Sequence, residues 1–122
     1  MNFKEGIPIF RQIVEDVKSK IVSGYYQPGQ RIESVRDLAS LYGVNPNTIQ
    51  KALTEMEMSH LLRADGPNGR YITEDYLLID AIKKETINQM VHDFVVQMKQ
   101  IGISIEDTVA LIQKFNEGDH YE

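Results

Sequence analysis

Three polar side chains that could bind nucleic acid lie close together near the middle of the chain. Asn47, Gln50 and Lys51 follow an Asn45-Pro46 pair, and this pair favours the start of a helix because asparagine caps the first turn and proline fits its first position. Amide groups can bond adenine at two positions, and a lysine ammonium reaches guanine or a phosphate. The pattern therefore favours a helix that reads duplex DNA, although polar residues on a helix also simply face solvent.

A second short helix is expected just before this one, over residues 34–42. Ser34 would cap it by accepting a hydrogen bond from the backbone N–H of Asp37, and Gly43 would end it. Only Gly43-Val44-Asn45 separates the two helices. Their apolar residues recur at helical spacing: Val35, Leu38, Ala39 and Tyr42, then Ile49, Ala52, Leu53 and Met56. Two short helices with so tight a glycine turn are typical of a helix-turn-helix.

The flanking segments extend this unit on both sides. An amphipathic helix is expected over residues 9–23, where apolar positions recur every three or four residues. Residues 61–64 and 70–73 flank the turn-forming run Asp65-Gly66-Pro67-Asn68-Gly69 and predict a β-hairpin. The predicted fold is mainly α with a small β-hairpin, that is, a winged helix-turn-helix followed by a helical tail.

Four segments in order, from Pro8 to about Thr73, resemble the GntR family of bacterial transcription regulators. They are Pro8-Ile9-Phe10-Arg11-Gln12-Ile13, Pro28-Gly29-Gln30-Arg31-Ile32, Ser34-Val35-Arg36-Asp37-Leu38-Ala39 and the run from Gly43 to Leu53. The Asn45-Pro46-Asn47-Thr48 sequence and the short tail look most like the YtrA subfamily. The resemblance implies a dimeric repressor that binds a double-stranded DNA operator with pseudo-palindromic half-sites.

The resemblance also implies which residues bind DNA. Arg36 matches an arginine that reads guanine or holds the backbone, and Gly69 matches the wing glycine that lets the chain approach the minor groove. Gln50 stands where many members have arginine, which would shift preference from guanine toward adenine. The complete expected set is Ser34, Arg36, Asn45, Asn47, Thr48, Gln50, Lys51, Arg63, Gly69 and Arg70.

Three features depart from the family pattern. Glu33 replaces the usual proline before the serine, and His60 replaces the usual glycine after the third helix. The wing has Pro67-Asn68-Gly69-Arg70 where a basic residue normally comes earlier. Arg70 then either reaches the minor groove or contacts no DNA.

A helical tail follows the predicted DNA-binding domain, with the boundary expected between residues 74 and 75. One long helix over residues 77–101 and a last helix from Ser104 to about Phe115 carry apolar stripes. A short helix pair cannot bury such stripes alone, so we expect a second copy to cover them. The expected homodimer contacts are Ile87, Met90, Val91, Phe94, Met98, Ile101, Ile105, Val109 and Ile112.

Charge is distributed unevenly along the chain, whose net charge is −5. Residues 1–74 carry nine Lys and Arg against nine Asp and Glu, whereas residues 75–122 carry four against nine. The first part is neutral, so the total does not exclude a nucleic-acid partner. Neutrality leaves a protein-interaction winged helix as an alternative, and a ligand-responsive sensor with its effector at the dimer interface is another.

Other classes of function have little support in the sequence. No nucleophile or paired-carboxylate arrangement has recognisable spacing, so we expect no enzyme. Without cysteine, and with His60, His92 and His120 scattered, we expect no metal and no cofactor. The tail is too short to enclose a typical ligand cavity, and it identifies no effector. No signal peptide and no membrane span are expected, and the expected location is the cytoplasm.

Overall fold

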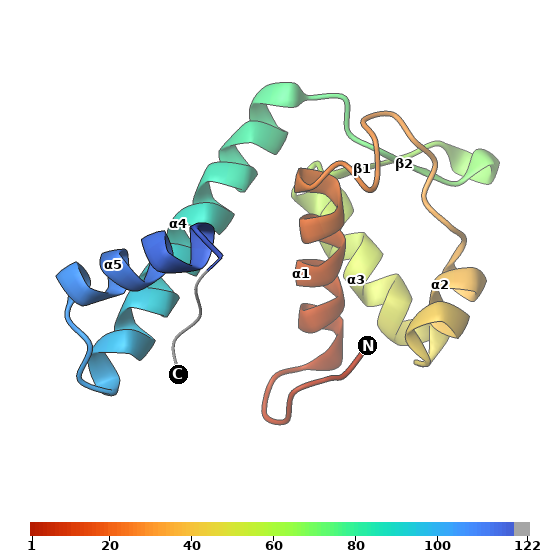
Figure 1. Cartoon of the computed structure of the whole chain (residues 1–122). Helices are drawn as coiled ribbons and strands as arrows, with labels where there is room; N and C mark the ends of the chain where they lie inside the picture. The colour runs from red at the N-terminus through yellow and green to blue at the C-terminus, as the bar shows by residue number, and fades with distance from the viewer. Residues whose placement is uncertain (119–122) are drawn as a thin grey trace. The chain divides into compact units, whose positions relative to one another are not determined.

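The computed structural model describes residues 1–118, and within them it contains five α-helices and one two-stranded hairpin (Figure 1). The elements in order are α1 (Ile9–Val22), α2 (Val35–Tyr42), α3 (Pro46–Met58), β1 (Leu62–Ala64), the 3₁₀-helix η1 (Gly66–Asn68), β2 (Arg70–Ile72), α4 (Tyr76–Gln100) and α5 (Ile105–Asn116). This order confirms the predicted fold class. The one unpredicted element is η1, which forms the tip of the hairpin.

The core lies between α1, α2, α3 and the hairpin. Side chains three or four residues apart share one face of a helix, and α1 accordingly buries Ile13, Val14, Val17 and Ile21. The inner residues of α3 are at most 1% exposed. Burying one such aliphatic side chain contributes about 1.5–3 kcal/mol. These stripes therefore fix the positions of α1, α2 and α3 relative to one another.

The hairpin is joined to the segment that precedes α2. Strands β1 and β2 are antiparallel, with Leu62 opposite Ile72 and Ala64 opposite Arg70. On the other side of β2, the Ile32 N–H donates to the Arg70 carbonyl at 3.0 Å, and the Ile72 N–H donates to the Gln30 carbonyl at 2.8 Å. The segment before α2 thus lies along β2 much as a third strand would.

The chain divides into two compact units, Met1–Lys83 and Lys84–Glu122. In the first unit, Leu78, Ile79 and Ile82 of α4 pack partly buried against the core, so this unit includes the beginning of α4. The functional boundary expected between residues 74 and 75 stays a prediction. His120 lies outside the described residues.

The second unit contains the rest of α4 together with α5. Ser104 caps α5 as expected, since its hydroxyl oxygen accepts a hydrogen bond from the Asp107 N–H at 3.1 Å. Thr108 is buried and its hydroxyl donates to the Ser104 carbonyl at 2.7 Å. Across residues 1–118, no helix combines the length and apolar character needed to cross a membrane.

Candidate nucleic-acid interface

The turn between α2 and α3 fixes where α3 begins. Gly43 has a φ of +67°, a left-handed conformation that glycine adopts without a Cβ clash. The Val44 N–H then donates to the Ala39 carbonyl at 3.0 Å. Asn45 caps the next helix, because its side-chain oxygen accepts a hydrogen bond from the Asn47 N–H at 2.8 Å. Both predicted helix ends are confirmed, and the first turn of α3 is held against α2.

The outer face of α3 presents polar groups to solvent. Asn47, Gln50 and Lys51 are exposed, and Thr48 is half-buried. The opposite face is the buried stripe of the core. Since the helix cannot rotate without exposing that stripe, these four side chains keep a fixed orientation toward solvent.

The start of α1 contacts α3 through two side-chain interactions. The Arg11 guanidinium donates two hydrogen bonds to the Glu55 carboxylate, at 2.8 and 2.7 Å. The Lys51 ammonium lies 4.1 Å from the centre of the Phe10 ring, within cation–π range. The Arg11–Glu55 pair was not predicted from the sequence, because residues 44 positions apart give no spacing signal.

Two of the residues expected to bind DNA, Ser34 and Arg36, lie at the beginning of α2. Ser34 is hydrogen-bonded within the helix end, whereas Arg36 is exposed to solvent. The Ser34 hydroxyl oxygen accepts a hydrogen bond from the Asp37 N–H at 3.1 Å, which confirms the predicted cap. Arg36 is exposed on the first turn of α2. It lies away from the buried Leu38 and Ala39, so its guanidinium extends from the domain toward solvent.

The two arginines of the wing lie in different surroundings. Arg63 of β1 is exposed, with its guanidinium 5.1 Å from the centre of the Tyr71 ring. Arg70 of β2 instead pairs with the Glu57 carboxylate of α3, and the two side chains are only 20% and 29% exposed. The charge of Arg70 is therefore neutralised inside the domain, and DNA contact by Arg70 stays a prediction.

Gly69 lies beside Arg31, which is not among the residues expected to bind DNA. Its φ is +98°, and a Cβ at this position would lie 2.9 Å from Nε of Arg31. Arg31 belongs to a segment quoted in the family resemblance, but a single basic residue in a loop carries no periodicity. The position of the Arg31 side chain depends on how the hairpin packs against the segment before α2, and the sequence pattern does not show this.

Two departures from the family pattern have structural explanations. His60 has a φ of +66°, the left-handed conformation that explains why glycine is usual there. Glu33 accepts a hydrogen bond from the Tyr26 hydroxyl at 2.6 Å. Burial raises the pKa of Tyr26 well above its usual value, and the bond to Glu33 raises it further.

The tail presents an apolar surface in the isolated chain. Eight of the nine residues expected to make homodimer contacts are exposed, and Met98 is half-buried. Phe94, for example, leaves 42% of its surface accessible.

The polar groups of the tail form local contacts. Asp93 accepts a hydrogen bond from Gln89 at 2.8 Å, and this bond together with the contact to His92 lowers the pKa of Asp93. No group of three potential metal ligands occurs within residues 1–118.

These elements define a winged helix-turn-helix domain that precedes a helical tail. The family model for bacterial regulatory proteins of the gntR family matches residues 10–72. The chain is 33% identical to the HTH-type transcriptional regulator YhcF of Bacillus subtilis, over 95% of this chain and 96% of YhcF. The chain belongs to the GntR family and is a helix-turn-helix transcriptional regulator.

Further relatives and solved structures agree with this assignment. The HTH-type transcriptional repressor YtrA of Bacillus subtilis is 29% identical, over 84% of this chain and 80% of YtrA. A GntR family regulator from Listeria monocytogenes has a TM-score of 0.82 at 35% identity, covering 92% of this chain and 98% of that one. The DNA-binding domain of AraR in complex with operator ORR3 has a TM-score of 0.54 at 26% identity, covering 60% and 88%.

Proposed function

We propose that the protein is a repressor that binds a pseudo-palindromic DNA operator as a homodimer in the cytoplasm. The observation that carries this proposal is the outer face of α3. Asn47, Gln50 and Lys51 are exposed there, while the Asn45 cap and the buried stripe fix the position of the helix. Preorganised polar groups at the start of a helix suit the major groove, where base edges carry sequence information.

Different residues are assigned different tasks in this proposal. Gln50 reads a base edge through its amide, and Asn47 and Thr48 bind a base edge or phosphate at the same helix start. Lys51 and Arg63 hold the backbone electrostatically, and Arg36 reads a guanine or binds the backbone from α2. All of these residues are exposed except Thr48, which is half-buried, and this exposure supports the assignments. The solved operator complex of the AraR domain, which shares this fold, supports DNA as the partner.

Dimerisation is supported by the apolar surface of the tail. Ile87, Met90, Val91 and Phe94 are each more than 40% exposed on α4, and Ile105, Val109 and Ile112 are similarly exposed on α5. Contiguous exposed apolar surface of this kind marks an interface. A second copy would cover it and would present two α3 helices to two half-sites. Linking two half-site contacts multiplies affinity by roughly 100-fold or more.

Repression is supported by the relationship to the transcriptional repressor YtrA of Bacillus subtilis. A dimer on an operator that overlaps a promoter would exclude RNA polymerase without any further domain. The sequence and the site identify no effector, so the proposal includes none.

The experiment is a binding titration by fluorescence anisotropy on duplexes selected from a random library. The wild type should bind selected duplexes much more tightly than random ones, and affinity should fall steeply between 50 and 200 mM salt, as phosphate contacts require. Arg36→Ala should weaken binding by roughly 1–3 kcal/mol. Lys114→Ala, which removes one positive charge from α5, is the matched control and should have little effect. Salt-independent binding, or no preference among duplexes, would contradict the proposal.

A further inference from the structure

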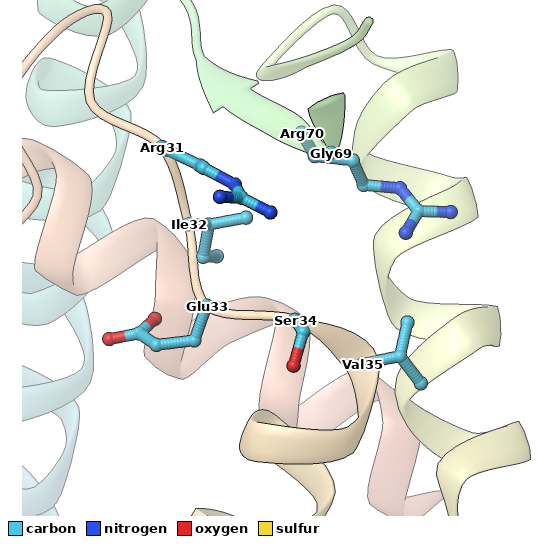
Figure 2. Close-up of a pocket in the computed structure, with 7 residues that line it drawn as sticks. All are labelled: Arg31, Ile32, Glu33, Ser34, Val35, Gly69 and Arg70. Atoms are coloured by element: carbon cyan, nitrogen blue, oxygen red, sulfur yellow. The ribbon is translucent and has the colours of Figure 1, made fainter. Parts of the chain in front are cut away.

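A small pocket lies between the segment before α2 and the start of β2, next to the tip of the wing (Figure 2). Its volume is about 150 Å³. Residues 31–35 form one wall, and Gly69 and Arg70 form the other. The first wall leads into α2 and the second begins β2, so the pocket belongs to the winged domain itself.

Arg31 supplies the available positive charge of this pocket. Figure 2 shows its side chain extending from the loop into the space beside the wing. No hydrogen bond or ion pair of the Arg31 side chain is found within residues 1–118. The other arginine, Arg70, is paired with Glu57. The one carboxylate in the lining, Glu33, accepts the Tyr26 hydrogen bond and points away from Arg31.

The backbone holds Arg31 firmly in this position. Its neighbours on both sides are hydrogen-bonded to β2, through the Gln30 carbonyl and the Ile32 N–H. Arg31 itself forms a bridge with Tyr71. The side chain therefore starts from strand-like backbone, and little conformational freedom of the main chain would be lost when it binds a ligand.

The absence of a side chain at Gly69 makes room for the guanidinium. A Cβ there would approach Arg31 Nε to 2.9 Å, a contact that real Cβ atoms essentially never make. Gly69 thus permits both the left-handed turn of the wing and the present path of Arg31. An alanine would force the arginine to move.

We propose that Arg31 binds a phosphate of the DNA backbone next to the tip of the wing and that Gly69 leaves the space in which its side chain is directed there. The inference rests on the proposed function, since it places one more phosphate contact beside α3. A guanidinium complements a phosphate in charge and in hydrogen-bond geometry. The pocket lies between Ser34 at the start of α2 and Gly69 of the wing, two positions that the family resemblance expects at the duplex, and this favours backbone phosphate over a free anion.

The first test is the salt dependence of binding for Arg31→Ala, Arg31→Lys and the control Lys114→Ala. One lost phosphate contact should lower the slope of log K against log salt by about 0.9, which corresponds to about eightfold weaker binding at 0.1 M salt. The loss should be equal on selected and random duplexes. Arg31→Lys should retain most of the slope. An unchanged slope in Arg31→Ala, with Arg36→Ala still impaired, would overturn this inference and leave the proposed function standing.

The second test is a double-mutant cycle between Arg31 and Gly69. If Gly69→Ala acts by displacing the guanidinium, it should weaken binding in the wild type and much less in the Arg31→Ala background. Thermal melts of each variant show whether it is folded at the assay temperature. Equal losses in both backgrounds would mean that Gly69 does not act through Arg31.

The third test separates a DNA phosphate from a free anion. Inorganic phosphate at millimolar concentration is titrated into the protein without DNA and followed by thermal melting. The proposal expects the same small effect on the wild type and on Arg31→Ala. A rise in melting temperature that Arg31→Ala abolishes, together with unchanged DNA binding by that variant, would assign the pocket to a free anion and overturn the proposal.

Discussion

Substitutions of Asn45 test two properties of α3 separately, namely its contribution to the free energy of unfolding and its affinity for DNA. The Asn45 side chain accepts a 2.8 Å hydrogen bond from the Asn47 N–H and is otherwise exposed at the start of α3. Asn45→Ala removes the cap and should lower the free energy of unfolding by about 1 kcal/mol. Asn45→Asp keeps the cap, and its negative charge interacts favourably with the helix dipole by about 0.3–1 kcal/mol. The aspartate variant should therefore be at least as stable as the wild type.

The same aspartate should impair DNA binding. A carboxylate roughly 6 Å from a phosphate is repelled by about 0.7 kcal/mol at the dielectric constant of water and by about 3 kcal/mol at an effective value of 20. Affinity should therefore fall by a factor between about three and 100. Urea denaturation measures the stability, and fluorescence anisotropy at 0.1 M salt measures the affinity. If Asn45→Asp bound DNA as tightly as the wild type while remaining folded, the start of α3 would not face a phosphate, and the proposed docking would be wrong.

Three further predictions concern the tail, a strained residue and a buried hydroxyl. Phe94→Asp should give a monomer in sedimentation velocity at micromolar concentration, because an unpaired charge would be buried in the interface, whereas the control Gln97→Asp should stay dimeric. His60→Gly should raise the free energy of unfolding by about 1 kcal/mol in urea denaturation, because His60 has a φ of +66°; an unchanged value would show that no strain is stored there. Burial and the hydrogen bond to Asp16 raise the pKa of Tyr42 above 10.0, so the folded state keeps a proton that the unfolded chain loses. Stability should therefore fall as pH rises above about 10, and this fall should be shallower in Tyr42→Phe.

Local features of the sequence were enough to predict the helices and their ends. The inner residues of α1 recur at helical spacing, and a stripe of this kind buries itself in any compact fold. The caps at Ser34 and Asn45 act within three residues along the chain, so they too are visible in the sequence. The exposed face of α3 followed directly, because it is the face opposite the buried stripe.

The ion pairs of the site could not be predicted in the same way. Glu57 meets Arg70 and Glu55 meets Arg11 only after the hairpin and α1 have packed against α3. Which carboxylate meets which arginine depends on tertiary register, and the sequence pattern does not record it. For the same reason the sequence pattern indicated Arg70 as a basic residue of the wing and gave no sign of its ion pair with Glu57. It also gave no sign that the Arg31 side chain extends into the pocket beside Gly69.

The Tyr26–Glu33 hydrogen bond holds the loop before α2 at the position where proline is usual in the family. A proline restrains such a loop by limiting the freedom of the unfolded chain, an entropic effect that persists on heating. A hydrogen bond acts mainly through enthalpy, and its contribution to holding the loop diminishes as temperature rises. The backbone at Glu33 should therefore loosen on heating before the helical core unfolds, whereas Arg31 stays held by the hydrogen bonds of its neighbours to β2. In this chain, the entry to α2 would lose order on heating before the winged domain unfolds.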